Sequence, residues 1–468
     1  MRREFVKRIW FKAAIVCCAL LLAGLQANAA ITLLANGTLT GSSAGYYTDL
    51  SGLNYNLENG VSAALLGGLG SGIAYASGNT FLALPDRGPN AVSFDSAIDD
   101  TASYVNRFHT IQMDLQRNTG GGLPFLLTPN LQSTTLLWSR APLVYGTGQG
   151  LGVGSGVPPG NGPNQFYFSG RSDNFDSTMN SSNAADARFD TEGIRASGDG
   201  KFVYISDEYG PYVYEFSRAT GMRTRTFTLP AHLFVTNLSP VGNTEIANNT
   251  SGRTANKGME GLAITPDGKT LVGIIQAALI QDNNQGGKAK KLLRIITIDV
   301  ASGEWTHEYA YLLTTGSGVS EMLAINQHEF LVDERDGNGL GNGNDAVVKQ
   351  LFKIDLANAV DVSSMDGLTA ASHAVSKTLF LDLVQILTAA GIPASKIPAK
   401  IEGLAFGPDV SYGVTMHTLW VANDNDFVQD YNGVTNSNPN QFYVFGFTNA
   451  DLGGSVYLPQ IFSNSKGR

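Results

Sequence analysis

Cysteine is almost absent from this sequence, because the only two cysteines, Cys17 and Cys18, lie near the amino terminus. Both fall in a stretch with a basic start, a short apolar core and an A-x-A cleavage motif. This pattern is typical of a secretory signal peptide over residues 1–29, and an uncleaved membrane anchor is the alternative. The mature chain would then contain no disulfide, so its stability must come from a large core.

Positive charge is also scarce. Removal of residues 1–29 takes away five basic residues and one acid, which shifts the formal net charge from −9 to −13. An acidic exported chain is poorly suited to nucleic acid or anionic membranes and well suited to divalent cations. We therefore expect a monomer in the periplasm or the extracellular medium, with no nucleic-acid partner and no stable membrane insertion after signal cleavage.

Several catalytic signatures are missing as well. The sequence shows no alternation of strands and helices, which argues against an α/β-hydrolase. The glycine-rich run at 146–164 lacks a Gly-Lys-Ser/Thr motif, so it reads as a surface loop and not as a phosphate cradle. The histidines share no motif and the mature chain has no cysteine, which argues against a zinc site.

A hairpin-like segment recurs along the chain. Each copy has an apolar strand that begins at an acid followed by glycine, then a turn, then a second β-rich run. The copies begin EGIRA (192–196), EGLAI (260–264) and EGLAF (402–406), with a degenerate EMLAI (321–325) and SGIAY (71–75), in which serine replaces glutamate. Hairpins repeated at such intervals are typical of the blades of a β-propeller.

The remaining segments complete an all-β propeller. Residues 292–305 and 350–359 read as third strands, and 306–313 as a fourth. A further blade is expected from the mature amino terminus paired with the carboxy-terminal strands, which would close the ring and remove exposed sheet edges. Six blades is the favoured count and five to seven remain open. Residues 30–468 are thus predicted as one propeller domain with a loop insertion near 146–186 and a helical insertion near 378–390.

The hairpin geometry predicts where the acids lie. In an antiparallel hairpin the first residue of one strand faces the last residue of the other. The first strands of propeller blades usually line the central channel, so these open ends should meet at one mouth. The expected pairs are Glu192 with Asp207, Glu321 with Asp333, Glu402 with Asp424, Ser71 with Asp86, and Glu260 with the amide of Gln276.

Carboxylates that converge in a channel mouth repel one another and need protons, basic side chains or metal ions. Basic residues stand close by in sequence, and oxygen ligands of this kind suit Ca²⁺ or Mg²⁺. The basic residues are Arg87, Lys257, Arg335 and Lys400. The simpler alternative is that the acids accept hydrogen bonds from loop amides and hold blade to blade. The Gly/Asn-rich run at 333–345 and residues 424–426 are further cation candidates, for which a plain turn is the alternative.

Four runs of the sequence resemble one known family. They are GLGSGIAYASGNTFLALPDRGPN (68–90), DTEGIRASGDGKFVYISDEYGP (190–211), NKGMEGLAITPDGKTLVGIIQAAL (256–279) and KIEGLAFGPD…LWVANDND (400–426). Together they resemble the phytase-like family, also described as "esterase-like activity of phytase". The resemblance implies a secreted bacterial β-propeller that acts on phosphoesters. Met322 departs from the family's E-G-L pattern beside Glu321.

The resemblance and the repeat together suggest roles for named residues. The expected catalytic residues are Asp86, Arg87, Glu192, Asp207, Lys257 and Glu260. The expected substrate-binding residues are Arg87, Lys257, Arg335 and Lys400. The expected ligands of a calcium cofactor are Glu192, Asp207, Glu208, Glu260, Glu321, Asp333, Glu402 and Asp424.

Two functions are compatible with these assignments. The first is a calcium-dependent phosphoester hydrolase that acts on a small phosphorylated substrate at the carboxylate ring. The second is a non-catalytic propeller module that binds a ligand or calcium at the same mouth, which the incomplete acid ring at Ser71 and Gln276 would favour.

Overall fold

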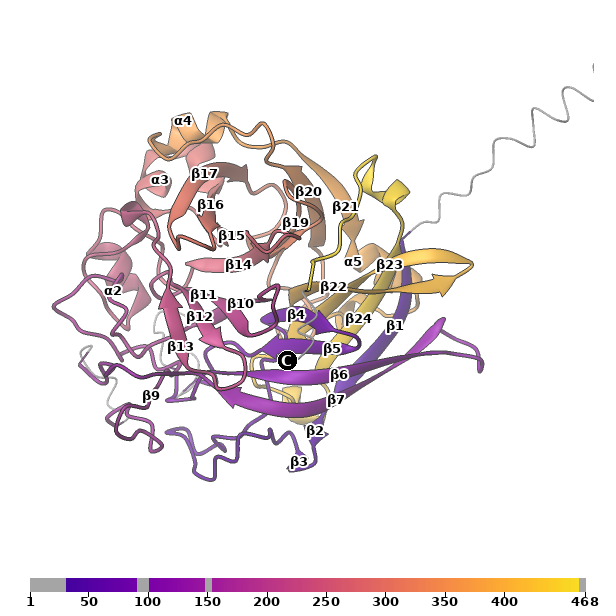
Figure 1. Cartoon of the computed structure of the whole chain (residues 1–468), viewed down its shortest axis with the longest axis horizontal. Coiled ribbons are helices and arrows are strands. Elements are labelled where there is room, and N and C mark those ends of the chain that lie inside the picture. Colours follow the sequence, from indigo (N-terminus) through magenta and orange to yellow (C-terminus); the bar gives the residue numbers. More distant parts are fainter. Residues whose placement is uncertain (1–30, 91–100, 148–153, 463–468) are drawn as a thin grey trace, which may run out of the picture.

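A computed structural model describes residues 31–90, 101–147 and 154–462, and the predicted signal peptide lies outside them. Five four-stranded antiparallel sheets are arranged around a common centre (Figure 1). The chain is therefore an all-β propeller, as the repeated hairpin predicts. Within the described ranges, none of the helices has the length and hydropathy that a membrane crossing requires.

Each sheet is one blade, and its strands follow the chain from the centre outward except in the last. Blade I contains β4 (Gly72–Ser77), β5 (Thr80–Leu84), β6 (Arg107–Arg117) and β7 (Phe125–Leu136). Blade II contains β10 (Thr191–Ala196), β11 (Phe202–Asp207), β12 (Val213–Ser217) and β13 (Arg223–Thr226). Blade III contains β14 (Met259–Ile264), β15 (Thr270–Ile275), β16 (Leu292–Asp299) and β17 (Trp305–Leu312). Blade IV contains β18 (Gly318–Ala324), β19 (Glu329–Arg335), β20 (Lys349–Asp355) and β21 (Lys377–Asp382).

Blade V joins the two ends of the chain. Its inner strands are β22 (Lys400–Tyr412), β23 (Val414–Asp424) and β24 (Asn440–Phe447), and its outer strand is β1 (Thr32–Leu39). The antiparallel pairing of β1 with β24 closes the ring, as expected. The favoured count of six blades exceeds the five in the described residues, because the hairpin at 402 and the paired termini form one blade and not two.

The innermost strands pack against one another in a closed circuit. In order around the centre, β4, β10, β14, β18 and β22 each contact the next, and β22 contacts β4. This close approach explains the glycine of the repeat. A Cβ at Gly72 would lie 2.4 Å from the carbonyl oxygen of Glu192, and one at Gly261 would lie 2.8 Å from the backbone of Glu321.

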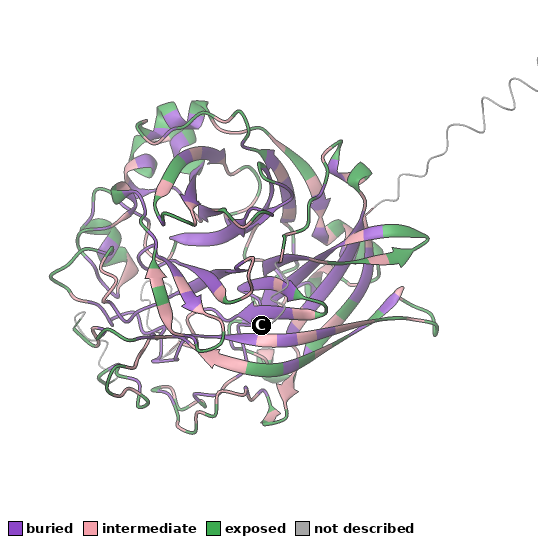
Figure 2. Ribbon diagram, viewed as in Figure 1, coloured by how far each residue is buried: buried purple, intermediate pink, exposed green. Residues whose placement is uncertain are grey.

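Apolar side chains fill the spaces between blades, and the inner strands are almost wholly buried (Figure 2). Between blades I and II, for example, Leu82 and Phe108 pack with Ile194, Ile205 and Tyr214 in one cluster. The core therefore lies between neighbouring sheets and around the centre, which holds each inner strand in a fixed position.

The connections carry short ribbons and helices. The two-stranded ribbons are β2 (Gly41–Ser42) with β3 (Gly45–Tyr46), and β8 (Trp138–Ser139) with β9 (Phe166–Tyr167). The α-helices in the described residues are α2 (Gly242–Ala247), α3 (Ile280–Gln285), α4 (Gly367–Ser372) and α5 (Leu383–Ala389).

The helix predicted near 378–390 starts later than expected. Residues 377–382 form β21 and pair with β20, and only α5 after them is helical. Asp382 sets this boundary, because its carboxylate accepts a hydrogen bond from the Gln385 amide at 3.0 Å and so caps the helix.

The tight centre predicts that Gly72→Ala lowers the free energy of unfolding by about 1–3 kcal/mol, because the new methyl group collides with the backbone of blade II. Gly337→Ala is the matched control, since a Cβ there meets no atom within 4 Å and the expected change is within about 0.5 kcal/mol. Urea denaturation measures both. Equal effects of the two substitutions would show that the centre is not tightly packed.

Candidate functional site

A cavity of about 180 Å³ lies at the mouth where the inner strands begin, and every residue that lines it is polar or charged. The strands supply residues from their open ends, and the loops before and after them supply the others. The lining residues are Asp86, Arg87, Glu192, Glu208, Asn256, Lys257, Glu260, Gln276, Arg335, Lys400 and Glu402. The structure thus brings together five of the predicted acids and all four predicted basic residues.

β-Bulges aim the glutamates of the repeat at this cavity. The pairing of β10 with β11 shifts between Thr191 and Ile194, so Glu192 lies in a bulge. The same kind of shift places Glu260 in a bulge of blade III and Glu402 in one of blade V. A bulge re-aims its side chain relative to a regular strand, so it determines which residues reach the cavity.

Glu321 lies outside the cavity because its bulge is displaced. In blade IV the pairing shifts between Val319 and Glu321, so the extra residue is Ser320 and Glu321 pairs regularly with Asp333. The Glu321 carboxylate accepts hydrogen bonds from the amides of Leu262 and Met322 at 2.9 and 2.8 Å. It also forms an ion pair with Arg195 at 2.8 Å. Its surroundings are those of a residue that joins blades.

Asp207 also lies outside the cavity, contrary to its expected place opposite Glu192. With the bulge in β10, Asp207 pairs with Thr191. Its carboxylate accepts the backbone amides of Asp190 and Gly210 at 2.6 and 2.7 Å. Burial raises the pKa of Asp207 to about 7. The next residue, Glu208, points to the other side of the strand and lines the cavity instead.

Asp333 is the third predicted acid that does not line the cavity. It is fully buried, and neither of its carboxylate oxygens has a hydrogen-bond partner among the described residues. Burial raises the pKa of Asp333 to about 8, although Arg335 and Lys349 lower it in part.

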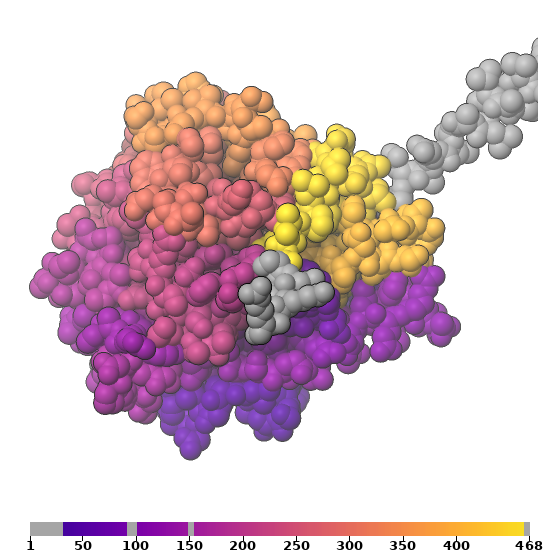
Figure 3. Space-filling view, viewed as in Figure 1, coloured from indigo at the N-terminus to yellow at the C-terminus, as the bar shows by residue number. Residues whose placement is uncertain are grey.

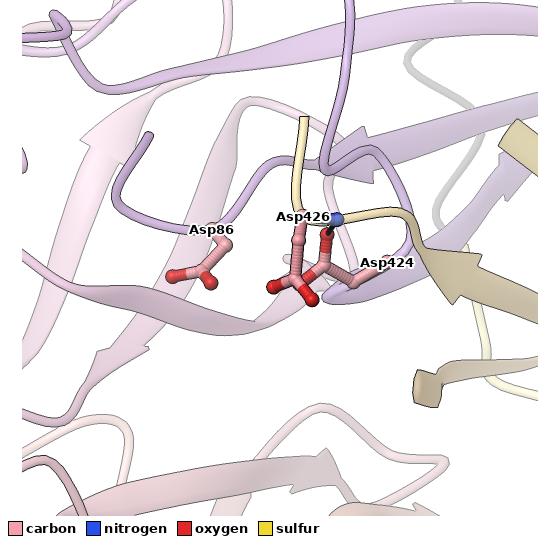
Figure 4. A group of neighbouring side chains, drawn as sticks. All are labelled: Asp86, Asp424 and Asp426. Carbon is pink, nitrogen blue, oxygen red and sulfur yellow. Dashed lines mark hydrogen bonds between the residues drawn. The ribbon is translucent and has the colours of Figure 1, made fainter. Parts of the chain in front are cut away.

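Lys400 neutralises one group of acids at the cavity rim. The three acids of this group, Asp86, Asp424 and Asp426, lie close together in Figure 4. The Lys400 ammonium is paired with Asp424, and it lies 2.8 Å from Asp426 and 3.5 Å from Asp86. Burial would lower the pKa of Lys400, but these carboxylates outweigh it and raise the pKa well above its ordinary value. A lysine therefore stands where a cation could have bound these acids.

Arg335 and Arg87 are anchored in the same way. Arg335 is paired with Glu402, lies 3.9 Å from Glu260 and donates to the Ser320 hydroxyl at 2.6 Å. Arg87 donates to Asp190 at 2.9 Å and to Asn256 at 2.6 Å. Lys257 is exposed and donates to the Gln276 amide oxygen at 2.8 Å. Arg87 and Lys257 thus border the cavity from blades I and III.

One group of acids keeps bare oxygen atoms. Glu192, Glu208 and Glu260 each offer a carboxylate oxygen, and these atoms lie within 4.8 Å of one another. One oxygen of Glu208 and one of Glu260 have no hydrogen-bond partner among the described residues. Asp190 has a similar bare oxygen and forms a second group with Asp86 and Glu192.

The protonation of these acids reflects their crowding. Burial and the neighbouring carboxylates raise the pKa of Glu192 and of Glu260 well above the ordinary value. Burial also raises the pKa of Glu208, while the adjoining Glu260 carboxyl and the basic residues Lys257 and Arg87 act in the opposite direction. Each of these acids therefore takes up a proton more readily than an ordinary carboxyl, and a divalent ion would compete with that proton for the same oxygens.

A lysine ammonium binds oxygens of the predicted cation loop at 333–345. The Lys349 ammonium donates to the backbone and side-chain oxygens of Asp336 at 2.9 and 2.7 Å, and to the Asn338 carbonyl at 3.0 Å. Lys349 is fully buried. Its ammonium takes up the oxygens that made this loop a cation candidate.

Two lining or neighbouring residues were missed by the sequence reasoning. Asp190 lies two residues before Glu192, and Asn256 lies directly before Lys257, so proximity to the motif was the available signal. Asp426 belongs to the predicted cation candidate at 424–426, and the structure pairs it with Lys400.

Comparison with known proteins identifies relatives of the chain. A family model described as "Phytase-like: Esterase-like activity of phytase" matches residues 64–427. A protein of Arthroderma benhamiae named "Uncharacterized secreted protein" is 33% identical over 177 residues, which is 32% of this chain and 34% of the relative. The match thus spans about a third of that relative's length, and its fungal source shows that such sequences are not confined to bacteria.

Solved structures resemble the chain only distantly. The hydrazine synthase of Kuenenia stuttgartiensis is 12% identical with a TM-score of 0.31, and the match covers 81% of each chain. The PQQ-bound aldose sugar dehydrogenase of Streptomyces coelicolor is 13% identical with a TM-score of 0.31, and the match covers 86% of this chain and 84% of that one. At this distance the likenesses say nothing about chemistry.

The neighbours Asp207 and Glu208 should behave differently when neutralised. Asp207→Ala removes the acceptor of two buried amides, so the free energy of unfolding should fall by about 1–3 kcal/mol. Glu208→Ala removes no such acceptor and should leave stability within about 1 kcal/mol in the absence of calcium. Thermal or urea unfolding in a chelator measures both. The assignment is wrong if Glu208→Ala is the more destabilising of the two.

The pKa of Asp333 predicts a pH dependence of stability. Between its ordinary value of 3.8 and about 8 the folded chain holds a proton that the unfolded chain releases, so the free energy of unfolding falls as pH rises through this range. Asp333→Asn should flatten that fall, as measured by urea denaturation from pH 4 to 9. Glu304→Gln, at an exposed carboxylate, is the control and should leave the slope unchanged. An unchanged slope for Asp333→Asn would contradict the prediction.

Proposed function

The chain belongs to the phytase-like family, and from this we propose that it is a phosphoester hydrolase whose substrate enters the polar cavity at the propeller mouth. One observation carries the proposal. The cavity combines five buried or part-buried carboxylates with four basic side chains, and some of its carboxylate oxygens have no partner among the described residues.

A phosphate group would be repelled by the acids alone, so we propose that calcium is the cofactor. The bare oxygens of Glu208 and Glu260 fit such an ion, with Glu192 as the third ligand and Asp190 close by. Carboxylate oxygens are the preferred ligands of calcium, which takes about six to eight oxygens in all, waters included. When bound, calcium attracts phosphate oxygens and lowers the pKa of water.

The basic residues divide into two classes in this proposal. Arg335 and Lys400 are held in ion pairs with acids of the cavity, so they neutralise the acids rather than bind substrate. Arg87, whose ion-pair partner Asp190 does not line the cavity, and Lys257 are the candidates to contact the phosphoryl group. Asp190 and Asn256 hold the Arg87 guanidinium in place, so it needs no reorganisation as charge develops on the substrate.

The setting of the reaction follows from the same features. We propose that the mature chain is exported, to the periplasm or the medium, and acts there as a monomer on a small phosphorylated molecule. The secretory pattern at residues 1–29 and the secreted relative support export. The ring is closed within one chain by the pairing of β1 with β24, which supports the proposal of a monomer.

A non-catalytic calcium-binding propeller is the second candidate. It is favoured by the acids that the structure places in ion pairs or on backbone amides, such as Glu321 and Asp207. In that case calcium would stabilise the mouth and no ester would be cleaved.

The test is an assay of the mature protein on p-nitrophenyl phosphate and bis(p-nitrophenyl) phosphate, with calcium or with a chelator. We expect calcium-dependent cleavage, and Glu260→Gln should reduce it by about 100-fold or more, because that residue is a proposed ligand. Glu304→Gln is the control. Calcium affinity, measured by calorimetry, should rise with pH because the ligands must lose protons.

The outcomes separate the two candidates. Calcium binding that is lost in Glu260→Gln, with no cleavage of either ester by the parent protein, would favour the binding module. The absence of both calcium binding and cleavage would contradict both proposals.

A further inference from the structure

A second cavity lies at the other end of the inner strands from the polar mouth. Its volume is about 450 Å³, within the range of small-molecule sites. Residues of all five inner strands line it, and it shares no lining residue with the polar cavity. On its outer side lies the carboxy-terminal segment, of which 457–460 and Phe462 line the cavity.

Alanines of the repeat leave this space open. Three residues after the acid or serine that begins each copy, four of the inner strands carry alanine. Ala74, Ala324 and Ala405 line the cavity, and Ala263 does not. The small side chains thus leave a gap between the ends of the inner strands and the segment that crosses them.

The crossing segment, residues 455–462, is here called the strap, and it touches every blade of the ring. Figure 3 shows the carboxy-terminal segment in yellow, running from blade V toward the centre of this face. Each blade contacts the strap through a hydrogen bond or a pair of aromatic rings. The contacts join Tyr457 to Phe406 of blade V, Leu458 to Ile325 of blade IV, Gln460 to Ala196 of blade II, Ile461 to Pro266 of blade III, and Phe462 to Tyr75 of blade I.

A lysine and a glutamate anchor the start of the strap. The Lys353 ammonium donates to the Leu452 carbonyl at 2.8 Å and to the Ser455 hydroxyl, and the Glu329 carboxylate accepts the Ser455 hydroxyl. Residues 456–462 carry no charged side chain. The rest of the strap is therefore held without ion pairs, by single hydrogen bonds and ring contacts.

The strap beyond Ser455 has little packing to lose. It forms no strand, and the ring is closed without it by the pairing of β1 with β24. Val456, Leu458 and Ile461 are exposed by 55, 41 and 65%. The cavity, and not a packed core, lies behind it. Few buried contacts and the lack of strand pairing are features of segments that open without unfolding of the whole domain.

We propose that the strap is a lid on this cavity, which opens from its carboxy-terminal side while the five blades stay folded. In the closed state it holds Tyr457 and Phe462 over the end of the channel. In the open state the alanine-lined wall becomes accessible to small molecules. The lid is independent of the phosphoester chemistry proposed for the opposite mouth.

The test places a single thiol behind the lid of the mature chain, whose own cysteines are confined to the predicted signal peptide. Ala405→Cys lies in the cavity wall at a residue that is 2% exposed. Ala263→Cys is the matched control, because Ala263 has the same place in the repeat, is fully buried and does not line the cavity. Labelling with excess dithiobis-nitrobenzoate is followed by the absorbance of the released thiolate.

We expect Ala405→Cys to react at least about 100-fold faster than Ala263→Cys. The first thiol needs only the lid to open, whereas the second needs the blades to separate. Urea below the unfolding transition should accelerate Ala263→Cys far more than Ala405→Cys, because the slope with urea follows the surface that is exposed. Ala324→Cys, which also lies in the cavity wall, takes the place of Ala405→Cys if that variant does not fold.

A second substitution links the labelling to the lid. Gln460→Ala removes the hydrogen bond of 2.8 Å from the Gln460 side chain to the Ala196 carbonyl, so it should accelerate labelling of Ala405→Cys about 5-fold. Gln385→Ala, at an exposed residue of α5, is the control and should leave the rate unchanged. Equal rates for the cavity thiol and the Ala263→Cys thiol, or a rate that Gln460→Ala does not change, would overturn the proposal.

Discussion

Mutual repulsion between carboxylates that meet in a buried cavity is the constraint on which this mouth of the propeller depends. For most of the acids, ion pairs with basic residues of the chain relieve this repulsion. Lys400 pairs with Asp424, and Arg335 pairs with Glu402. In the group of Glu192, Glu208 and Glu260, one oxygen of Glu208 and one of Glu260 have no hydrogen-bond partner among the described residues, so a divalent cation has most to stabilise there.

The architecture of the ring determines which acids enter that group. The inner strands approach one another so closely that glycine is needed after the acid, and the bulge at the same place turns the acid toward the cavity. In blade IV a methionine follows Glu321, the bulge falls on Ser320, and the glutamate turns to Arg195.

The sequence allowed the propeller, the closure by the termini and the gathering of acids and bases at one mouth to be predicted, because all three follow from a repeated hairpin. It did not allow the number of blades to be predicted, since nothing in the hairpin that begins at Glu402 shows that it shares a sheet with β1. Nor did it reveal the β-bulges, because the register of the strands depends on contacts with the next blade. Owing to the bulge in β10, Glu208 lines the cavity in place of the expected Asp207. Lys349 lies outside the 333–345 run whose oxygens it binds, so that candidate loop looked available for a metal.

The most direct test of the central claim is a crystal structure of the mature protein grown with calcium and inorganic phosphate, with anomalous diffraction used to locate calcium. We predict a calcium peak bounded by Glu192, Glu208 and Glu260, with phosphate density on the side of Arg87 and Lys257. A well-defined mouth with no calcium at these three carboxylates, at a calcium concentration that saturates binding in solution, would contradict the account.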